Sequence, residues 1–383
     1  MEPKIRFKGF EGEWKALPIT EIASLKAGKS FNKLDAVDTP TTGYYPCYGG
    51  NGQRGYLPYY NQNGKYNIIG RQGALCGCVN VAEGKFYATE HAVIVTPITI
   101  TDFEFLHESL VRANINQYAT GAAQPGISVT NVNSQLSLNY PLYKEQKAIG
   151  KYFTSLDSQI SASTSRLASL KQMKAASLQA MFPQKGETVP KVRFKGFEGE
   201  WKKVKFSELY ERSSIKNDLS FGADKIISVA NMYFIKNSRQ VDDDYLRSYN
   251  IMRLGDIAFE GNKSKDFAHG RLVENTIGDG IVSHVFVVMK PKSKKYDLNF
   301  WKYYINNENI MGNILIRSTK SSTMMTDLVI DDFLKESILV PSYEEQVEIG
   351  KILTSLDHQI TLQTQRLEKL KQIKSACLDK MFV

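Results

Sequence analysis

Two segments of the sequence each occur twice. Residues 3–14, which read PKIRFKGFEGEW, return with one difference as residues 190–201, and we call these two segments the arms. Residues 143–182 return as residues 343–382 with over half of the positions identical, and we call these the tails. The chain therefore contains two copies of one unit, each a divergent region followed by a tail. A shared framework that carries two different divergent regions explains this pattern better than an accidental duplication, because only the ends of the copies are alike.

The tails have the apolar spacing of paired helices. Apolar residues recur at alternating steps of four and three, which is the heptad pattern of a coiled coil. We expect two helices of about 57 Å, at about 1.5 Å per residue, that pair antiparallel because a folded domain separates them along the chain. Ordinary amphipathic core helices inside two domains are the alternative. The predicted seam residues are Ile149, Phe153, Leu156, Ile160, Leu167, Leu170 and Met181 in the first tail, and Ile349, Leu353, Leu356, Ile360, Leu367, Leu370 and Met381 in the second.

The divergent regions have the pattern of mixed α/β domains. A weak match between residues 91–97 and 284–291 indicates that both regions share a fold. We therefore predict an α+β protein with two globular mixed α/β domains, related by pseudo-two-fold symmetry and separated by an antiparallel coiled coil of two long helices. Strands are predicted at 66–69, 92–95, 225–229, 256–259 and 285–289, and short helices at 103–114 and 299–309. The predicted boundaries are 1–142 for the first domain, 143–183 for the first long helix, 184–342 for a linker and the second domain, and 343–383 for the second long helix.

Loops in both divergent regions combine positive charge with amide and hydroxyl groups. The chain has 49 Lys and Arg against 40 Asp and Glu, and its net charge of +9 favours an acidic partner such as nucleic acid. Arg, Asn and Gln make bidentate contacts to base edges, and basic or hydroxyl side chains also contact phosphate. Plain solvated loops are the alternative. The candidate DNA-binding residues are Lys29, Tyr48, Asn51, Gln53, Arg54, Arg71, Gln72, Gln124, Asn262, Lys263, Ser264, Lys265, Arg271, Arg317, Lys320 and Ser321.

No catalytic constellation is visible in the sequence. It contains no P-loop, zinc-protease or serine-hydrolase motif. Residues 50–55 match G-x-G-x-x-G, but no helix start and no suitably spaced acidic residue follow them, so a dinucleotide site is rejected. Cys47, Cys76, Cys78 and His91 are poorly spaced for zinc, and buried thiols with a hydrogen-bonded histidine are the expected interpretation. We expect no catalytic residue, no metal and no cofactor in this chain.

The sequence shows no sign of a membrane span or an export signal. No apolar run approaches the roughly 18 residues that a membrane helix needs, and the N-terminus lacks an apolar signal core. Four cysteines in 383 residues do not make a disulfide scaffold. We expect a cytoplasmic protein that makes no membrane contact.

Two divergent regions that alternate with two near-identical helical segments resemble the specificity subunit of Type I restriction-modification systems. The resemblance covers essentially the whole chain, although the second divergent region lacks the Gly-Gly-Asn-Gly and Gln-Pro motifs of the first. The segments that resemble this family are FKGFEGEW at Phe7 and Phe194, EQxxIG at Glu145 and Glu345, and the loops YGGNGQRGY, GRQGA and TGAAQP that begin at Tyr48, Gly70 and Thr120.

The resemblance implies a non-catalytic subunit that recognises a bipartite, asymmetric DNA site, one half with each target-recognition domain, while the helices set the gap. The implied partners are double-stranded DNA, two modification subunits that methylate adenine N6, and restriction subunits that translocate DNA. S-adenosylmethionine, ATP and Mg²⁺ are expected only on those partner subunits. Two other functions stay open: a stand-alone enzyme that acts on nucleic acid, and a coiled-coil scaffold without DNA contact.

Overall fold

The computed structural model describes residues 2–73, 75–121, 125–236, 241–293, 295–321 and 325–382. The chain forms two compact units: unit 1 is Met1–Ser165 with Gln365–Val383, and unit 2 is Arg166–Thr364. The long helices α4 (Tyr143–Ala180) and α10 (Tyr343–Met381) each contribute one part to each unit. The predicted mixture of helix and sheet, with two repeated domains and two long helices, is confirmed.

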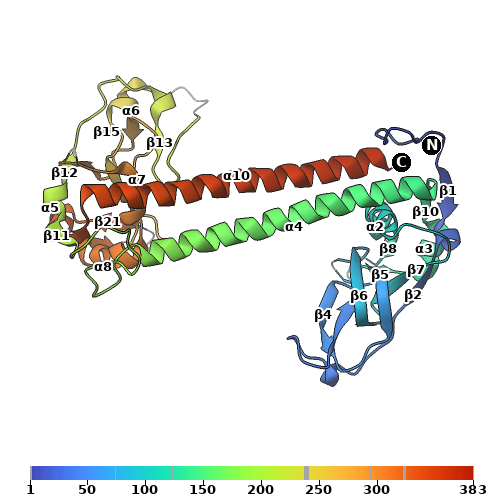
Figure 1. The fold of residues 1–383 in the computed structure, drawn as a ribbon. Coiled ribbons are helices and arrows are strands. Elements are labelled where there is room, and N and C mark those ends of the chain that lie inside the picture. Colours follow the sequence, from blue (N-terminus) through green and yellow to red (C-terminus); the bar gives the residue numbers. More distant parts are fainter. Residues whose placement is uncertain are drawn as a thin grey trace. The chain divides into compact units, whose positions relative to one another are not determined.

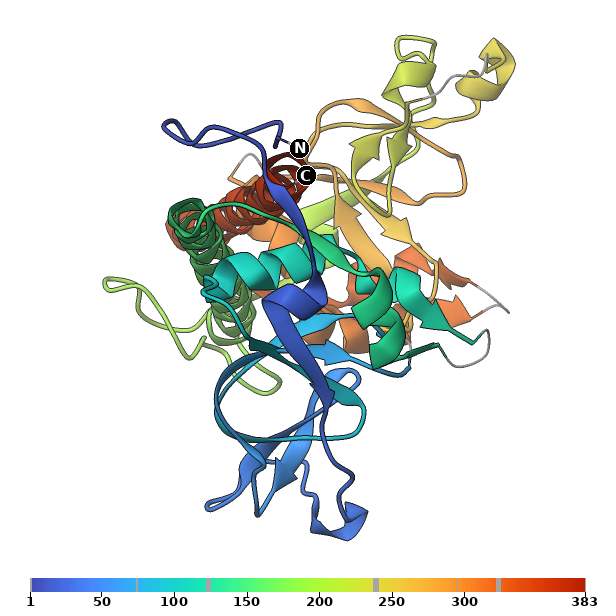
Figure 2. The ribbon, with the colours of Figure 1, turned by 90° about the vertical axis from the view of Figure 1, so that its right-hand side faces the viewer.

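Unit 1 contains a six-stranded sheet that packs against helices (Figure 1). The order is β2 (Ala23–Ala27), β7 (Ala92–Pro97), β5 (Gln62–Gly70), β6 (Val79–Ala88), β3 (Tyr45–Gly49) and β4 (Gly52–Leu57), antiparallel except between β3 and β6. Helix α2 (Phe103–Arg112) lies between this sheet and α4 (Figure 2). Leu106 and Leu110, one helical turn apart, pack into a cluster with Val93 of the sheet, whereas Phe105 packs into a second cluster with Phe153 of α4. The spacing of these apolar residues therefore gives α2 two buried faces.

Unit 2 repeats the core of this arrangement. Its sheet has the order β12 (Tyr210–Ser213), β19 (Val288–Pro291), β16 (Ile257–Glu260) and β17 (Arg271–Glu274), which corresponds to β2, β7, β5 and β6 of unit 1. Two helices follow the sheet, α7 (Leu298–Tyr304) and α8 (Glu308–Ser318). Unit 2 also contains the pairs β13 (Ile227–Ser228) with β14 (Tyr233–Phe234) and β15 (Asn250–Met252) with β18 (Gly280–Val282), and the helix α6 (Asp243–Arg247).

The smaller elements also have counterparts in the two units. Strand β1 (Lys15–Pro18) pairs with β10 (Ser137–Tyr140), and β11 (Lys202–Lys205) pairs with β22 (Ser337–Val340). The hairpin of β8 (Ala119–Thr120) and β9 (Gly126–Ile127) corresponds to that of β20 (Thr319–Ser321) and β21 (Thr326–Leu328). The short helices are α1 (Ile19–Ile22), α3 (Val129–Gln135), α5 (Phe206–Leu209) and α9 (Ile330–Lys335), and 3-10 turns cover Lys33–Asp35, Ile115–Tyr118 and Ala223–Lys225.

The two arms hold the start of each long helix in the same way. The Arg6 guanidinium donates to both carboxylate oxygens of Glu145, at 2.7 and 2.8 Å. Unit 2 repeats this ion pair at the same two distances with Arg193 and Glu345. Both carboxylates are almost fully buried. Because a buried charge is costly without a partner, each glutamate depends on the arginine of its arm.

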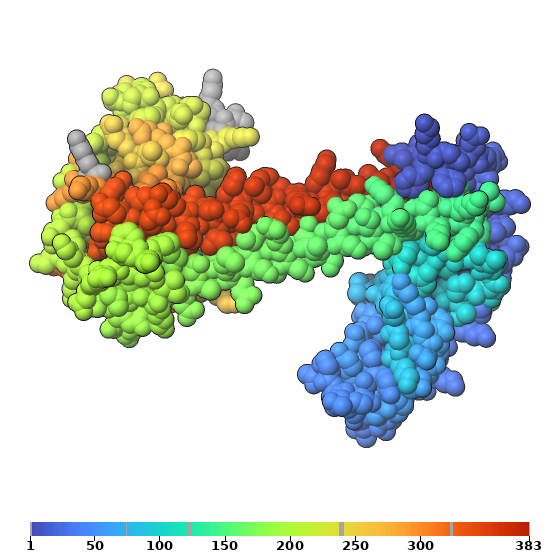
Figure 3. Space-filling view, viewed as in Figure 1, coloured from blue at the N-terminus to red at the C-terminus, as the bar shows by residue number. Residues whose placement is uncertain are grey.

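The arms also contact the ends of the long helices. Ile5 N donates to Lys380 O of α10, and Val192 N donates to Ala180 O of α4, both at 2.9 Å. Figure 3 shows the N-terminal arm in dark blue beside the C-terminal end of α10 in red. Each arm therefore joins the beginning of one long helix to the end of the other within a single unit.

Each tail ends in a phenylalanine that packs into a domain core. Phe382 belongs to unit 1, where it lies in an apolar cluster with Trp14. Phe182 belongs to unit 2, where it is fully buried in a cluster with Trp201. Each tail thus starts in one unit and ends in the core of the other. Both tails therefore pack against similar surroundings at their two ends, which explains why their sequences are alike.

Contacts inside each unit show that α4 and α10 run antiparallel. Lys374 Nζ lies 2.7 Å from Asp157 in unit 1, and Lys174 Nζ lies 2.5 Å from Asp357 in unit 2. In both pairs a late residue of one helix meets an early residue of the other, as antiparallel pairing requires. The predicted seam residues are all buried or half-buried: Ile149, Phe153, Leu156, Ile160, Leu167, Leu170, Met181, Ile349, Leu353, Leu356, Ile360, Leu367, Leu370 and Met381.

Three elements of the second divergent region differ from the sequence prediction. The strand predicted at 285–289 starts only at Val288, because Phe286 N closes a turn on Ser283 O. The strand predicted at 225–229 is shorter, because its first residue ends a 3-10 turn. The helix predicted at 299–309 is wrong as one element, because the Asn307 side chain accepts from Asn309 N at 3.0 Å and starts the new helix α8.

Candidate nucleic-acid interface

The loops after β5 and β16 occupy equivalent positions in the two units. In each, a hairpin strand donates a main-chain hydrogen bond to the first loop residue, and the second loop residue bridges to the hairpin. The bonds join Ile127 N to Arg71 O and Thr326 N to Gly261 O, both at 2.8 Å, and the bridges are Gln72–Gly126 and Asn262–Met325. Gln72 and Asn262 are both exposed. Two predicted DNA-binding amides thus stand at the same place in the two domains.

Three segments of unit 1 enclose a hollow of about 410 Å³. Its lining includes the predicted residues Asn51, Arg54 and Gln72, together with His91. The β3–β4 turn contacts the loop after β5 backbone to backbone, because a Cβ on Gly50 would lie only 2.4 Å from Gln72 O. The fold therefore gathers three predicted residues and adds His91, for which the sequence favours a hydrogen-bonded histidine over a zinc ligand and does not predict DNA contact. Its position directly before a predicted strand was the one signal that could have placed it at a sheet end.

Four other predicted residues of unit 1 are not among the residues that line this hollow. Lys29 follows β2 and Gln53 lies on β4, and both are exposed. Tyr48 is half-buried against Phe86, with ring centroids 5.5 Å apart, and burial raises the pKa of its hydroxyl. Arg71 donates to two main-chain carbonyl oxygens at 3.3 and 3.4 Å, so its guanidinium braces the loop.

The predicted residues of unit 2 gather where the loop after β16 meets the β20–β21 hairpin. Lys263 Nζ donates to Ser321 Oγ at 2.7 Å, which joins the loop to the hairpin. The exposed residues of this cluster are Asn262, Lys263, Ser264, Lys265, Lys320 and Ser321. Their ammonium, amide and hydroxyl groups are of the kinds that contact phosphates and base edges.

Arg271 is held within unit 2 by several groups at once. Its guanidinium donates to Ala230 O at 2.5 Å and lies 3.6 Å from a Glu260 carboxylate oxygen. It also lies over the Phe267 ring, 4.9 Å from the centroid. Because these contacts occupy the side chain on several sides, Arg271 contributes to the wall of the cluster.

Arg317 lies in the last turn of α8, so the prediction that it belongs to a loop is wrong. The capped helix that starts after Asn307 extends far enough to include it. Its guanidinium donates to both Glu336 carboxylate oxygens, at 2.7 and 2.6 Å, and these bonds lower the pKa of that carboxyl. A further predicted residue, Gln124, lies outside the described residues.

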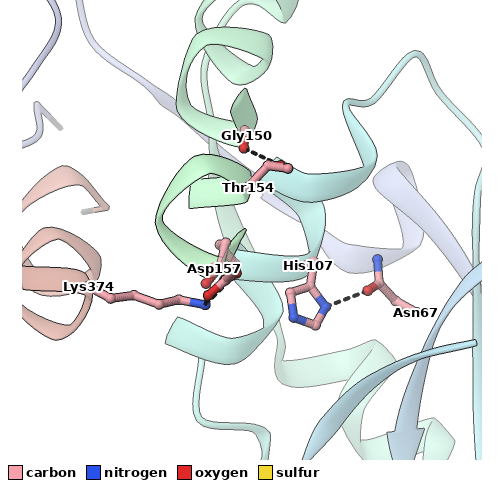
Figure 4. Close-up of polar contacts among 7 residues, drawn as sticks. Asn67, His107, Gly150, Thr154, Asp157 and Lys374 are labelled. Atoms are coloured by element: carbon pink, nitrogen blue, oxygen red, sulfur yellow. Dashed lines mark hydrogen bonds and ion pairs between the residues drawn. The ribbon is translucent and has the colours of Figure 1, made fainter. Parts of the chain in front are cut away.

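A polar cluster at the α2–α4–α10 contact of unit 1 was not predicted from the sequence. Lys374 reaches Asp157 across the helix pair, and His107 Nδ1 lies 2.7 Å from Asn67 Oδ1 (Figure 4). Lys374 also lies 2.9 Å from Glu108, a side chain only 2% exposed, and burial raises the pKa of that carboxyl. The cluster is an ion pair network that joins the domain to the helix pair.

The described residues contain no group of three or more His, Cys, Asp or Glu side chains that could hold a metal ion. Cys47 and Cys76 are buried thiols, and burial raises the pKa of Cys47 to about 11. Among the helices of this described part of the chain, none is long and apolar enough to span a membrane.

Comparisons with known proteins give consistent matches. A family model described as Type I restriction modification DNA specificity domain matches residues 11–172 and again 198–372. The Type I restriction enzyme EcoprrI specificity subunit of Escherichia coli is 38% identical over 154 residues, which span 40% of this chain and only 38% of that protein. The crystal structure of the Type-I restriction-modification system S subunit from M. genitalium has a TM-score of 0.69 at 16% identity, covering 100% of this chain and 99% of that chain, which establishes a shared fold.

Proposed function

Because the chain belongs to the family of Type I restriction modification DNA specificity domain proteins, we propose that it is the DNA-recognising subunit of such a complex. Unit 1 recognises one half of a bipartite DNA site and unit 2 recognises the other half. The two halves differ in sequence, so the whole site is asymmetric.

One observation carries this proposal: equivalent loops differ in their side chains while the framework around them is repeated. Gln72 and Asn262 occupy the same place, but the next residue is Gly73 in unit 1 and Lys263 in unit 2. The arm ion pairs of Arg6 and Arg193 have the same geometry in both units. Repetition of the framework with different exposed side chains is what two recognition domains of different specificity require.

The chemistry of the loops favours DNA over an uncharged partner. Amides and guanidinium groups bond to base edges, and ammonium groups bond to phosphates. The net charge of +9 adds a general attraction to the duplex. Binding through phosphates releases counterions, so the affinity of the assembled complex should fall steeply with added salt.

The helices α4 and α10 provide a means of setting the gap between the half-sites. Each helix passes through both units without an internal proline. We propose that the pair holds the recognition domains on one groove about one helical turn of DNA apart, roughly 34–36 Å. Lengthening both helices by the same number of residues should lengthen the spacer of the recognised site without changing its two ends.

The chemistry on DNA is assigned to partner subunits in this proposal. Two modification subunits with bound S-adenosylmethionine flip the target adenine out of the stack and methylate its N6. Restriction subunits supply translocation with ATP and Mg²⁺. This chain holds the duplex in position and supplies no catalytic group, and it acts in the cytoplasm, where these partners and the DNA are found.

Selection from a random DNA pool by the chain assembled with its modification subunits tests the proposal. We expect a split motif with a degenerate spacer, and methylated adenines in both halves of it. A short continuous motif, or no motif at all, would contradict the proposal. Methylation or cleavage by the purified chain alone would favour a stand-alone enzyme, and binding that ignores sequence and salt would favour a scaffold.

Exchange of one divergent region tests the assignment of one half-site to each unit. Replacing residues 15–140 with the divergent region of another family member should change one half of the motif and leave the other half intact. A change in both halves would show that the units do not recognise DNA independently.

A further inference from the structure

The hollow of unit 1 is shaped by backbone more than by side chains. Its glycines bring the β3–β4 turn and the loop after β5 into direct contact, because a Cβ on Gly70 would lie 2.0 Å from Gly50 O. Gly52 and Gly73 have positive φ angles of 88° and 96°, which side chains adopt only with strain. Main chain at Gly49, Gly50 and Gly73 therefore forms part of the lining, and the volume of about 410 Å³ lies within the usual range of about 300–1,000 Å³ for small-ligand sites.

Arg54 is positioned at this hollow with its hydrogen-bonding groups available. Its guanidinium lies over the Phe31 ring, 5.3 Å from the centroid, and its Cδ lies so near Gly49 that an added Cβ would be 3.0 Å away. Among the described residues, none accepts a hydrogen bond from this guanidinium. Stacking thus fixes the direction of a planar group whose fork of N–H donors remains available for a ligand.

His91 directly precedes β7, and hydrogen bonds to its backbone hold it in place. Its carbonyl accepts from Arg71 N at 2.8 Å, and its own N–H lies 3.3 Å from the Thr89 hydroxyl. The ring is partly exposed, and its Nε2 lies 3.5 Å from a Glu90 carboxylate oxygen. The sheet therefore fixes where this imidazole enters the hollow.

The side chains that line the hollow have the donors and acceptors of a base-recognition site. The described residues of its lining supply one guanidinium, two amides and one imidazole, and none of them carries a carboxylate. The four polar side chains are those of Asn51, Arg54, Gln72 and His91. A guanidinium fork matches the O6 and N7 acceptors of guanine, which is the commonest specific contact to a base. None of the described lining residues offers a carboxylate that would accept from the amino group of cytosine.

We propose that this hollow recognises one guanine in the half-site of unit 1, with Arg54 as the residue that specifies it and His91 as a second specificity-determining residue. This inference rests on the proposed function, since it assumes that unit 1 contacts DNA. Arg54 donates to O6 and N7 of the guanine, while Asn51, Gln72 and His91 contact the neighbouring base edges.

Arg54→Lys is the sharpest test, because lysine keeps the charge but loses the bidentate fork. The variant, assembled with modification subunits, is compared with the unmodified complex by selection from a random DNA pool. We expect the preference for guanine at one position of one half-site to fall by about 5- to 100-fold. Binding to non-specific DNA should stay unchanged, because the phosphate attraction is retained.

Arg112→Lys is the matched control, since Arg112 is an exposed arginine of unit 1 on α2 and lies outside the hollow. It should leave the motif unchanged. His91→Ala should relax a position next to the guanine and leave the other half-site intact. Because Arg54 is exposed, its replacement should not affect folding, and equal melting temperatures of the variant and unmodified chains would verify this.

The outcomes separate this inference from the proposed function. Loss of the guanine preference in the Arg54→Lys complex, with the rest of the motif retained, supports the inference. An unchanged motif, or a uniform loss of affinity that points to a phosphate contact, overturns the inference and leaves the proposed function standing. If the unmodified complex selects no split motif, the proposed function itself fails.

Discussion

The arm contacts of the two units and the loops after β5 and β16 have diverged to very different degrees. Arg6 with Glu145 and Arg193 with Glu345 repeat the same buried ion pair at the same distances. The loops after β5 and β16 share main-chain hydrogen bonds to the adjacent hairpins, whereas the side chains that brace them, Arg71 in unit 1 and Lys263 in unit 2, are not equivalent. Side chains that hold the framework cannot change without loss of a partner, whereas loops held by their backbone leave their side chains free to differ.

A second comparison concerns the contact between each domain and the helix pair. In unit 1 Lys374 bonds to Asp157 and to the buried Glu108. In unit 2 Lys174 bonds to Asp357, which also accepts from the Tyr303 hydroxyl at 2.5 Å. The bridge between the helices is the same in both units, but its third member is a carboxyl in one and a phenol in the other.

The largest expected effect comes from removing the terminal phenylalanines of the tails. Phe182→Ala should destabilise unit 2, and Phe382→Ala should destabilise unit 1, each by about 3–5 kcal/mol, because the change leaves a cavity in a core. Urea unfolding gives the total loss, and hydrogen exchange shows which unit opens. Met173→Ala, at an exposed position of α4, is the control and should change stability by less than about 0.5 kcal/mol. If both phenylalanine variants open the same unit, the two tails do not end in the cores of different units.

The arm ion pairs should give the next largest effect. Arg6→Ala and Arg193→Ala each leave a buried carboxylate without its partner, and we expect a loss of about 3 kcal/mol in the corresponding unit. The double variant Arg6→Ala with Glu145→Gln should recover part of the loss, because the uncompensated charge is removed. Urea unfolding of the single and double variants measures this coupling. Unequal losses in the two units would show that the arms do not contribute equally.

The equivalent amides should affect DNA recognition more modestly. Gln72→Ala and Asn262→Ala should each weaken binding by about 1 kcal/mol, roughly fivefold, through one lost base contact. Binding assays with DNA mutated in one half at a time show which half-site is affected. The two variants should affect opposite halves, and an effect of both on the same half would contradict the equivalence of the loops.

The smallest expected effect concerns Glu108, the third member of the bridge in unit 1, and the pH dependence of its contribution to stability. Burial raises the pKa of Glu108, so the folded protein holds this proton more tightly than the unfolded chain does. The contribution of Glu108 to stability therefore declines as the pH rises from the unfolded value of about 4.3 through the raised folded value. Glu108→Gln removes this titration, so the stability of the variant relative to the unmodified chain should improve as the pH rises above about 4.3.

Tyr303→Phe provides the matched control for this pH series. Burial raises the pKa of the Tyr303 hydroxyl far above neutrality. Burial also opposes ionisation of Asp357, but hydrogen bonds from Lys174 and Tyr303 lower its pKa overall. Neither group titrates between about pH 5 and pH 8, so the stability difference measured by urea unfolding should stay flat. If the stability difference between Glu108→Gln and the unmodified chain is equally flat, burial does not raise the pKa of Glu108 as proposed.

Local sequence patterns predicted some elements of the fold and misplaced others. The heptad spacing around Ile149 and Ile349 predicted two long helices, since that spacing is a pattern of residues near in sequence. The helix break at Asn307 was missed, because an asparagine serves equally as a helix cap or as a surface residue. That miss also placed Arg317 in a loop when it belongs to the end of α8.

The sequence by itself determined the repeated architecture of this protein, because repetition and periodicity are properties of neighbouring residues. Only the tertiary structure decided which residues meet from distant segments. His91 joins Arg54 and Gln72 because sheet order and glycine contacts bring three chain segments together. Phe382 reaches Trp14 because antiparallel helices return the chain end to its beginning. Such contacts depend on packing between segments far apart along the chain, and no local pattern of residues specifies them.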